Sequence, residues 1–556
     1  MKKGRPGTKK RNAGDNMKAG VKETESTRFS PFSNIREGWI VSILLGLAFG
    51  VRLYLVFHTY LITNDGILYV KMSKLISQGE TGAAFSLLFF NLYPVITAVF
   101  QKVFNDWEFS GQMVSAVFGS LSIIPFYFLI RSLLGRTVAF ISSILFVFHP
   151  YLVRFSAEVI KGPTFWFFFL MALWLGWEAL TRKRLWLFAL TSLLAAISFL
   201  VRTEGILIVP LIAVWVFLRN WETVKSTYGQ RIFHAAILLL TVPVLLSPAV
   251  LYLKKKTGHW HWARADAITG IATADVTMSN IKKSFHRLEM EPWDNSPETQ
   301  NEFIRLREFL SLAKDHRIGI IGLEMVIKFF KTIHPLLFIL LIFGAVKRKE
   351  IQYRKEEELF LLSVVAIILL ILVRYGTVYI YIGTRHMIAP VILCLGWAGI
   401  GVFELGYRIR HTPWLLRVKD GRGAGLRNIH WVLLIVIILA LLPKTLAPQR
   451  AEKIPIKEAG RWIGAHGPRA PVIMAHGGLA RIAFYADGTF LEVPKDQDLF
   501  EYAKRNRVHF LAINEKDIDQ SHANLVNSID SDHFREEVII GEHSGSYVIR
   551  IYSVES

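Results

Sequence analysis

Cysteine is almost absent from this sequence: Cys394 is the only one among 556 residues, and it lies inside an apolar run. A disulfide scaffold and a cysteine-based metal site are therefore both excluded. Charged residues are also scarce, at 20% of the chain, whereas hydrophobic residues make up 52%. A soluble protein of this length would have shorter apolar runs that are broken by charge.

Long apolar runs occur again and again along the chain. A helix needs roughly 20 such residues to cross a bilayer. We therefore expect an α-helical integral membrane protein with about eleven transmembrane helices, at residues 38–58, 109–131, 137–150, 162–180, 185–201, 205–218, 232–253, 325–346, 358–380, 386–407 and 429–447.

The net charge of +21 would suggest a nucleic-acid partner in a soluble chain, but here the Lys and Arg residues cluster in alternate loops. Such clusters mark the cytoplasmic side of a membrane protein. With a cytoplasmic N-terminus, all the clusters fall on one side of the membrane: residues 2–11, 182–184, 219–231, 347–355 and 408–427. The charge is thus a topology signal. It predicts a multi-pass protein of the cell (inner) membrane and no nucleic-acid partner.

Composition divides the chain into three parts. Residues 1–37 are polar and basic, which predicts a disordered cytoplasmic tail. Residues 38–447 form the transmembrane domain, with two long outer loops at 59–108 and 254–324. Residues 448–556 have the composition of a soluble domain and follow an odd number of spans, which predicts an extracytoplasmic α/β domain.

Short strand and helix patterns alternate in that last part of the chain. The expected strands lie at 472–474, 489–493, 509–513, 538–540 and 547–551. The expected helices lie at about 456–465, 478–486, 496–506 and 522–528. We expect this domain to aid acceptor capture or to order a loop, without supplying a catalytic base.

The two long outer loops have different patterns. The first has an amphipathic stretch after Asp65 and then a short apolar piece, 95–100, which we expect to lie as a helix at the membrane interface. The second begins with a cluster of lysines at 254–256 and carries alternating His and Trp at 259–262, whose Trp residues suit an interface. It also has a helix-like stretch around 297–315.

Ionisable residues at the outer ends of the spans are the candidate functional residues. Charges at a membrane are costly and are usually paired or functional. At any single position, a solvated helix end explains such a charge equally well. A set of charges on one face, around two long loops, favours a shared site, and the members of this set are Asp65, Glu158, Arg202, Glu204 and Arg385.

Six short motifs follow one another in a recognisable order: 65–69 with Leu75 and Gly79, 91–94, 154–158 with Gly162 and Pro163, 202–205, 381–390 and 459–463. Together they resemble the membrane glycosyltransferases of the GT-C fold. The likeness is strongest to the bacterial protein-mannosyltransferase and aminoarabinose-transferase branch. It covers most of residues 38–556 and implies a GT-C transmembrane domain.

The resemblance also implies an activity. It is the transfer of a sugar from a polyprenyl-phosphate carrier to a hydroxyl acceptor, on the extracytoplasmic face, by an inverting single displacement. Eukaryotic protein mannosyltransferases have adjacent Asp-Glu in the first loop, whereas this chain has Asn64-Asp65-Gly66. Lipid, glycan and protein acceptors therefore all stay open.

The residue types fit that chemistry. A carboxylate beside the acceptor hydroxyl can act as a general base. We assign this role to Asp65 and name Glu158 as a second catalytic candidate that orients the acceptor. Cationic side chains bind phosphate, and the candidate substrate-binding residues are Tyr69, Arg202, Glu204, Arg385, Lys254 and Lys255.

The same residues and loops raise three alternatives. Asp65, Glu158 and Glu204 offer oxygen ligands to a hard divalent cation, but the resembled branch does not as a rule need a metal, and no metal or other cofactor is predicted. An O-antigen ligase or polymerase-type enzyme generally lacks a C-terminal domain of this size. A lipid-linked-sugar transporter or flippase would place charges midway along the spans.

Overall fold

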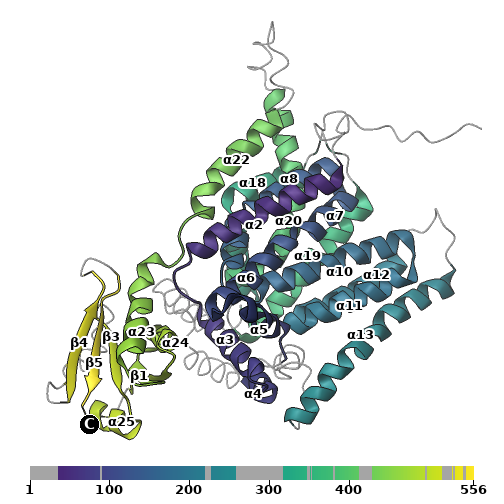
Figure 1. Cartoon of the computed structure of the whole chain (residues 1–556). Helices are drawn as coiled ribbons and strands as arrows, with labels where there is room; N and C mark the ends of the chain where they lie inside the picture. Colours follow the sequence, from purple (N-terminus) through teal and green to yellow (C-terminus); the bar gives the residue numbers. More distant parts are fainter. Residues whose placement is uncertain are drawn as a thin grey trace, which may run out of the picture.

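The computed structural model describes residues 36–87, 90–219, 227–257, 317–346, 348, 351, 354–379, 382–411, 429–494, 498–515, 529, 533–542 and 546–555. Within these residues the chain is mostly helical, and a small sheet lies at its C-terminal end (Figure 1). Expectations that fall on other residues, including the tail, the 259–262 and 297–315 segments and the 522–528 helix, lie outside the described residues.

The helices of the transmembrane part are the following: α2 (Glu37–Phe57), α3 (Asn64–Ser77), α4 (Thr81–Leu87), α5 (Leu92–Phe104), α6 (Trp107–Leu121), α7 (Ile123–Leu134), α8 (Arg136–Val147), α9 (Pro150–Ser156), α10 (Gly162–Arg182), α11 (Leu185–Val201), the 3-10 turn η1 (Thr203–Leu207), α12 (Ile208–Leu218), α13 (Tyr228–Thr257), α17 (Arg317–Ile333), α18 (Pro335–Ala345), α19 (Lys355–Tyr379), α20 (Thr384–Arg410) and α22 (Ile429–Thr445).

Six helical segments among the described residues are long and apolar enough to cross a membrane: α2, the run α6–α7, α10, α13, α19 and α20. The number is eight if the bent pairs α8–α9 and α17–α18 each count as one span. Three shorter apolar helices, α11, η1–α12 and α22, coincide with the remaining spans predicted from the sequence. A helical multi-pass membrane protein is therefore confirmed, and a count of about eleven requires that these three helices cross as well.

Two of the predicted spans are not straight helices. The span predicted at 137–150 ends at Val147, and α9 continues at 58° to α8. The span predicted at 325–346 breaks at His334, which has a positive φ of 76°, and α17 and α18 meet at 102°. Both breaks fall at a His-Pro step, because Pro lacks an N–H and pushes the preceding residue out of the helical region.

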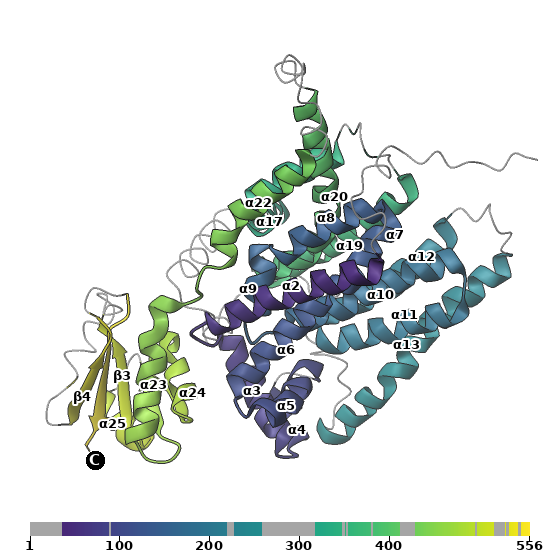
Figure 2. The same ribbon diagram turned by 45° about the horizontal axis from the view of Figure 1, so that its top comes forward.

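The first outer loop folds into α3, α4 and α5. α3 covers the amphipathic stretch expected after Asp65, and α5 covers the short apolar piece at 95–100. With 13 residues, α5 is shorter than a span. These helices gather at the end of the bundle opposite to the one where α2 begins, beside the C-terminal domain (Figures 1 and 2).

The C-terminal domain has the predicted α/β character. Its elements are η4 (Ala451–Lys453), α23 (Ile454–His466), β1 (Val472–Ala475), η5 (Gly477–Leu479), α24 (Arg481–Tyr485), β2 (Thr489–Glu492), α25 (Leu499–Arg505), β3 (Phe510–Asn514), β4 (Phe534–Ile540) and β5 (Ile549–Val554). The strand order is β2-β1-β3-β5-β4. β1 is parallel to β2 and β3, whereas β5 is antiparallel to β3 and β4. Every residue of β3 is buried, as expected for a central strand.

Close backbone packing joins α18 to α20. A Cβ atom added at Gly344 would stand 1.8 Å from the carbonyl oxygen of Trp397, and one added at Gly401 would stand 1.9 Å from that of Leu340. Small residues allow such an approach between membrane helices. The two helices therefore meet through their backbones, and α20, which carries Arg385 at its start, is held firmly in the bundle.

We expect Gly344→Ala to destabilise the protein, because the methyl group has no room beside a backbone carbonyl. Overpacking typically costs about 1–3 kcal/mol. The matched control is Gly46→Ala on α2, where a Cβ meets no atom within 4 Å. Thermal unfolding of the detergent-solubilised variants measures the difference. Equal melting temperatures for Gly344→Ala and wild type would contradict this packing.

Candidate active site

Asp65 lies in the first turn of α3, the helix that stands beside the C-terminal domain (Figure 1). The helix begins there because the Thr63 hydroxyl accepts a hydrogen bond from the Gly66 N–H at 2.9 Å. The same hydroxyl donates to the Val159 carbonyl at 3.3 Å. An acidic side chain in a first turn also interacts favourably with the helix dipole. The start of α3 is thereby tied to the loop before α10.

Arg385 reaches Asp65 from the first turn of α20. Its guanidinium donates to the Asp65 carboxylate and forms an ion pair with it. Both side chains are about one quarter exposed, at 22% and 25%, so ligands have access to the pair. The structure thus brings together two of the residues predicted from the sequence, although 320 positions separate them.

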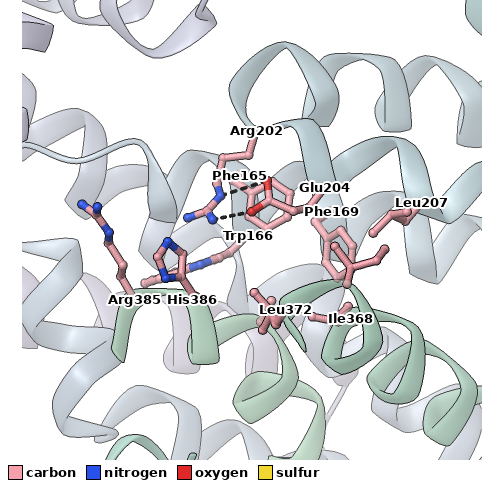
Figure 3. A pocket seen from close by; sticks show the side chains of 12 residues that line it. Phe165, Trp166, Phe169, Arg202, Glu204, Leu207, Ile368, Leu372, Arg385 and His386 are labelled. Carbon is pink, nitrogen blue, oxygen red and sulfur yellow. Dashed lines mark hydrogen bonds and ion pairs between the residues drawn. The ribbon is translucent and has the colours of Figure 1, made fainter. Parts of the chain in front are cut away.

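Arg202 and Glu204 form a second ion pair where α11 turns into η1. The Arg202 Nε donates to the Glu204 Oε2 at 3.3 Å, and the second contact, from Nη2 to Oε1, is 2.5 Å long. The guanidinium also lies 5.5 Å from the centre of the Phe165 ring. Figure 3 shows this pair and Arg385 on neighbouring parts of one pocket.

The pocket has one polar edge and apolar walls. Its empty space, open solvent included, is about 420 Å³. Arg202, Glu204, Arg385 and His386 form the polar edge. The walls are Phe165, Trp166 and Phe169 on α10, Leu207 on η1, Ile368, Ile371 and Leu372 on α19, and Ala389 on α20. Such a lining suits a ligand with one anionic end and an apolar body.

Two further titratable residues, Tyr69 and Lys161, lie close enough to these ion pairs for the charges to affect their pKa values. Tyr69 is buried on α3 and packs edge-to-face on Tyr93 at 5.3 Å; burial, and next the charge of Asp65, raise its pKa, so its hydroxyl stays protonated. Lys161 directly precedes α10. Burial lowers its pKa to about 8, and the neighbouring charges of Arg202 and Arg385 act in the same direction, against those of Glu204 and Asp65.

Sequence reasoning missed Lys161. The available signal was a single lysine between Glu158 and the start of a span, on the side predicted to be poor in basic residues. Arg450 was missed as well, because it follows the last predicted span and belongs to no recognised motif.

Glu158 has partners other than the residues around Asp65. Its carboxylate is 3% exposed and accepts from the Arg450 guanidinium at 2.6 Å and from the Arg154 Nε at 3.4 Å. Among the described residues it does not line the pocket. This placement favours a role in holding the start of the C-terminal segment, and the role of Glu158 in orienting the acceptor stays a prediction.

Lys254 and Lys255 also lie away from the pocket. They are exposed at the C-terminal end of α13, where the Tyr252 and Thr81 hydroxyls form a hydrogen bond and the Tyr252 ring meets Phe85 edge-to-face at 6.2 Å. The structure therefore places these lysines beside α4 and not with Arg385.

The three carboxylates named from the sequence each pair with an arginine: Asp65 with Arg385, Glu158 with Arg450 and Glu204 with Arg202. Within the described part of the chain, no group of three His, Cys, Asp or Glu residues stands close enough to hold a metal ion.

Residues 91–247 match the protein-family model described as dolichyl-phosphate-mannose-protein mannosyltransferase. A search of curated protein sequences gives no match. Among solved structures, ArnT from Cupriavidus metallidurans bound to undecaprenyl phosphate is similar at 13% identity, with 93% of this chain and 98% of that chain covered and a TM-score of 0.52. The same protein in the apo state gives 12% identity, the same coverage and a TM-score of 0.52.

A third similar structure is the Archaeoglobus fulgidus oligosaccharyltransferase tethered to an acceptor peptide. It is 11% identical, with 94% of this chain and 74% of that chain covered and a TM-score of 0.53. These likenesses show the fold. The chain has the GT-C fold with a small C-terminal sheet domain, as the order of its sequence motifs predicted.

We expect Glu158→Gln to lower the free energy of unfolding, since a buried arginine loses its counter-charge. Breaking a buried ion pair typically costs about 3–5 kcal/mol, and the hydrogen bond that Gln keeps places the loss near the lower figure. Thermal and denaturant unfolding measure it, with Glu452→Gln at an exposed neighbouring site as the control. If Glu158→Gln had unchanged stability but no turnover, the result would favour the predicted catalytic role of Glu158.

Proposed function

We propose that this chain is a glycosyltransferase that moves a sugar from a polyprenyl-phosphate carrier to a hydroxyl acceptor. The observation that carries the proposal is the pairing of Asp65 with Arg385, an arginine on the polar edge of an otherwise apolar pocket. The donor has the same division of character, because its phosphate is anionic and its isoprenoid chain is apolar.

The comparisons support a lipid-linked substrate in general terms. The family model that matches residues 91–247 is named for mannosyl transfer from dolichyl phosphate. One similar structure holds undecaprenyl phosphate, and another is tethered to an acceptor peptide. The proposal names neither the sugar nor the acceptor of this chain. Lipid, glycan and protein acceptors are all compatible with it.

Three cations define the donor side. Arg385 and Arg202 line the polar edge, and Lys161 lies near enough for their charges to act on it. Each of the three side chains can bind a phosphate oxygen. Arg385 is the best placed, since it is partly exposed and its planar guanidinium suits a bidentate contact. The aromatic side chains of α10 then take the first isoprene units of the carrier.

In the proposed reaction Asp65 is the general base. The acceptor oxygen attacks the anomeric carbon, the bond from that carbon to the phosphate oxygen breaks, and the hydroxyl proton passes to the Asp65 carboxylate. Polyprenyl phosphate leaves as an anion that the cations hold, and the single displacement inverts the anomeric centre. None of these steps needs a metal ion or another cofactor.

The ion pair gives this mechanism an order of events. Before the donor binds, Arg385 occupies one face of the Asp65 carboxylate. A donor phosphate offers Arg385 a second anion, so the guanidinium turns toward the phosphate and the carboxylate becomes available to the acceptor. Base and phosphate site are thereby coupled, and the base is exposed only when a donor is present.

We further propose that the site faces the extracytoplasmic side of the cell (inner) membrane, with a cytoplasmic N-terminus. The alternation of basic loops supports this orientation. This orientation requires the first outer loop and the C-terminal domain to share one side of the membrane. In the described structure, α3 and the C-terminal domain lie at the same end of the bundle (Figures 1 and 2).

Asp65→Asn should lower turnover by about 10²–10⁴-fold, the usual contribution of base catalysis. Donor binding should persist, because the released Arg385 keeps its charge. Purified protein in nanodiscs, with a labelled carrier-linked sugar, allows kcat and donor affinity to be measured separately. The matched control is Asp487→Asn, which removes an exposed ion pair with Lys74 of the same helix and should have little effect. A near-normal rate for Asp65→Asn would remove Asp65 from the base role.

Donor affinity should fall as pH rises above about 8, because Lys161 binds phosphate in its charged form and burial lowers its pKa to about 8. The fall is at most about tenfold per pH unit for one titrating group. In Lys161→Arg the charge persists at all these values, so affinity should be flat between pH 7 and pH 9. Parallel profiles for the two proteins would exclude Lys161 from the phosphate site.

A further inference from the structure

The six residues that join α2 to α3, 58–63, are held, together with Asn64 at the start of α3, mainly by residues that come 389 to 423 positions later. We call this segment the α2–α3 linker. At its start, the Gln449 N–H donates to the His58 carbonyl at 2.9 Å, and the Tyr60 N–H donates to the Gln449 carbonyl at 3.2 Å. This exchange places the linker beside the entry to the C-terminal domain.

Arg450 holds the middle of the linker. One guanidinium nitrogen donates to the Leu61 carbonyl at 3.2 Å, and another donates to Glu158 at 2.6 Å. The Leu61 side chain is fully buried and belongs to the apolar core of the C-terminal domain, with Ile456 and Ile482 among its members. The linker is therefore structurally part of that domain at this point.

Helix α24 holds the end of the linker. The Ile62 N–H donates to the Tyr485 hydroxyl at 2.8 Å, and the Arg481 Nε donates to the Asn64 side-chain oxygen at 2.8 Å. Arg481 is only 2% exposed, so water does not compete with this contact. Asn64 is the first residue of α3, and Asp65 follows it directly.

The same helix is fixed to the transmembrane part. The Tyr485 hydroxyl donates to the Glu108 carboxylate of α6 at 2.9 Å, and the Lys457 ammonium binds the other oxygen of Glu108 at 2.9 Å. Burial, and next the charge of Glu108, raise the pKa of Tyr485, which keeps its hydroxyl protonated for this donation. α24 thus has fixed contacts on both sides.

The first turn of α3 is tightly packed, so a movement of the residues before it also moves Asp65. A Cβ at Gly66 would lie 2.8 Å from the Ile62 side chain and 3.0 Å from that of Val159. A shift of residues 62–64 is therefore passed to Asp65 instead of being absorbed by a loose turn.

We infer that Arg481 and Tyr485 of the C-terminal domain are positioning residues for Asp65. Neither residue lines the pocket, and both act by fixing the backbone that carries the Asp65 carboxylate. This inference rests on the proposed function, since it assumes that the position of Asp65 limits turnover. It assigns to the C-terminal domain a part in the chemical step in addition to any part in acceptor capture.

Arg481→Ala should lower kcat about tenfold or more, since a misplacement of about 1 Å can cost about 10²-fold. Donor affinity should change less than about twofold, because Arg385, Arg202 and Lys161 are untouched. Arg481→Lys keeps a donor for Asn64 and should recover part of the rate. The control is Arg505→Ala, which removes an exposed cation from α25 in the same domain.

A double-mutant cycle identifies the contact itself. Asn64→Ala and Arg481→Ala should each reduce kcat, and the double variant should be no worse than the poorer single one, because both remove the same hydrogen bond. Additive losses would overturn the inference. Tyr485→Phe, which removes only one oxygen atom, keeps the test available if Arg481→Ala does not fold, and it should also lower kcat at unchanged donor affinity.

Hydrogen–deuterium exchange of the amides of residues 60–66 gives a readout that does not depend on activity. Arg481→Ala and Tyr485→Phe should accelerate exchange there, and Arg505→Ala should not. Faster exchange with normal kcat would overturn the positioning role and leave the proposed function standing. A wild-type protein that protects these amides but transfers no carrier-linked sugar would overturn the proposed function, and with it the catalytic consequence, while the structural tie would still be measured.

Discussion

Asp65 on α3 and Arg385 on α20 form an ion pair between a helix outside the spans and the start of a long buried helix. Charges beside a membrane are costly unless they are paired. The pairing therefore fixes where α3 can lie on the bundle, and it also holds the Asp65 carboxylate against a guanidinium that lines an apolar pocket. Stability and the proposed chemistry thus share one interaction, and a donor phosphate would be the group that competes for it.

The other two outer carboxylates follow the same rule with different results. Glu204 pairs with Arg202 within a single turn, which leaves that arginine on the polar edge of the pocket. Glu158 pairs with Arg450 and is buried, so it connects the loop before α10 to the segment that enters the C-terminal domain. Carboxylates at three similar positions therefore pair with an arginine of the pocket in two cases and with an arginine beside the C-terminal domain in the third.

The C-terminal domain packs on the segment that leads into α3. Its core includes Leu61 from the α2–α3 linker, and its helix α24 bonds to residues on either side of Thr63, the cap of α3. The proposed base on α3 is thereby held by the C-terminal domain, whereas the proposed phosphate-binding residues lie directly after α11 and on α20. The domain would act on the donor side only through the contact between Asp65 and Arg385.

The sequence predicted well what depends on composition along the chain. Apolar runs located the helices, and alternating short patterns located all five strands of the C-terminal sheet, because these signals are local. The resemblance of ordered motifs selected the GT-C fold and Asp65 and Arg385 as members of one site. The His-Pro breaks at 149–150 and 334–335 were missed, because hydropathy stays high across them even though Pro marks the break.

Partners could not be read from the sequence. Glu158 and Arg450 are 292 positions apart, and Asn64 and Arg481 are 417 apart. No local pattern links such residues, so only the folded chain shows that Glu158 is engaged by a cation outside the pocket. Lys254 and Lys255 were selected for their charge alone, and their place at the end of α13 depends on how that helix crosses the bundle.

The central claim, that the pocket beside Asp65 and Arg385 holds a polyprenyl-phosphate sugar, is tested most directly by native mass spectrometry of the protein purified in mild detergent. The account predicts a retained lipid whose mass matches a polyprenyl phosphate with or without one sugar, and loss of that lipid in Arg385→Ala. The claim would be contradicted if the wild-type protein retained only bulk phospholipid even when polyprenyl phosphate is supplied in excess, and if Arg385→Ala retained the same lipids.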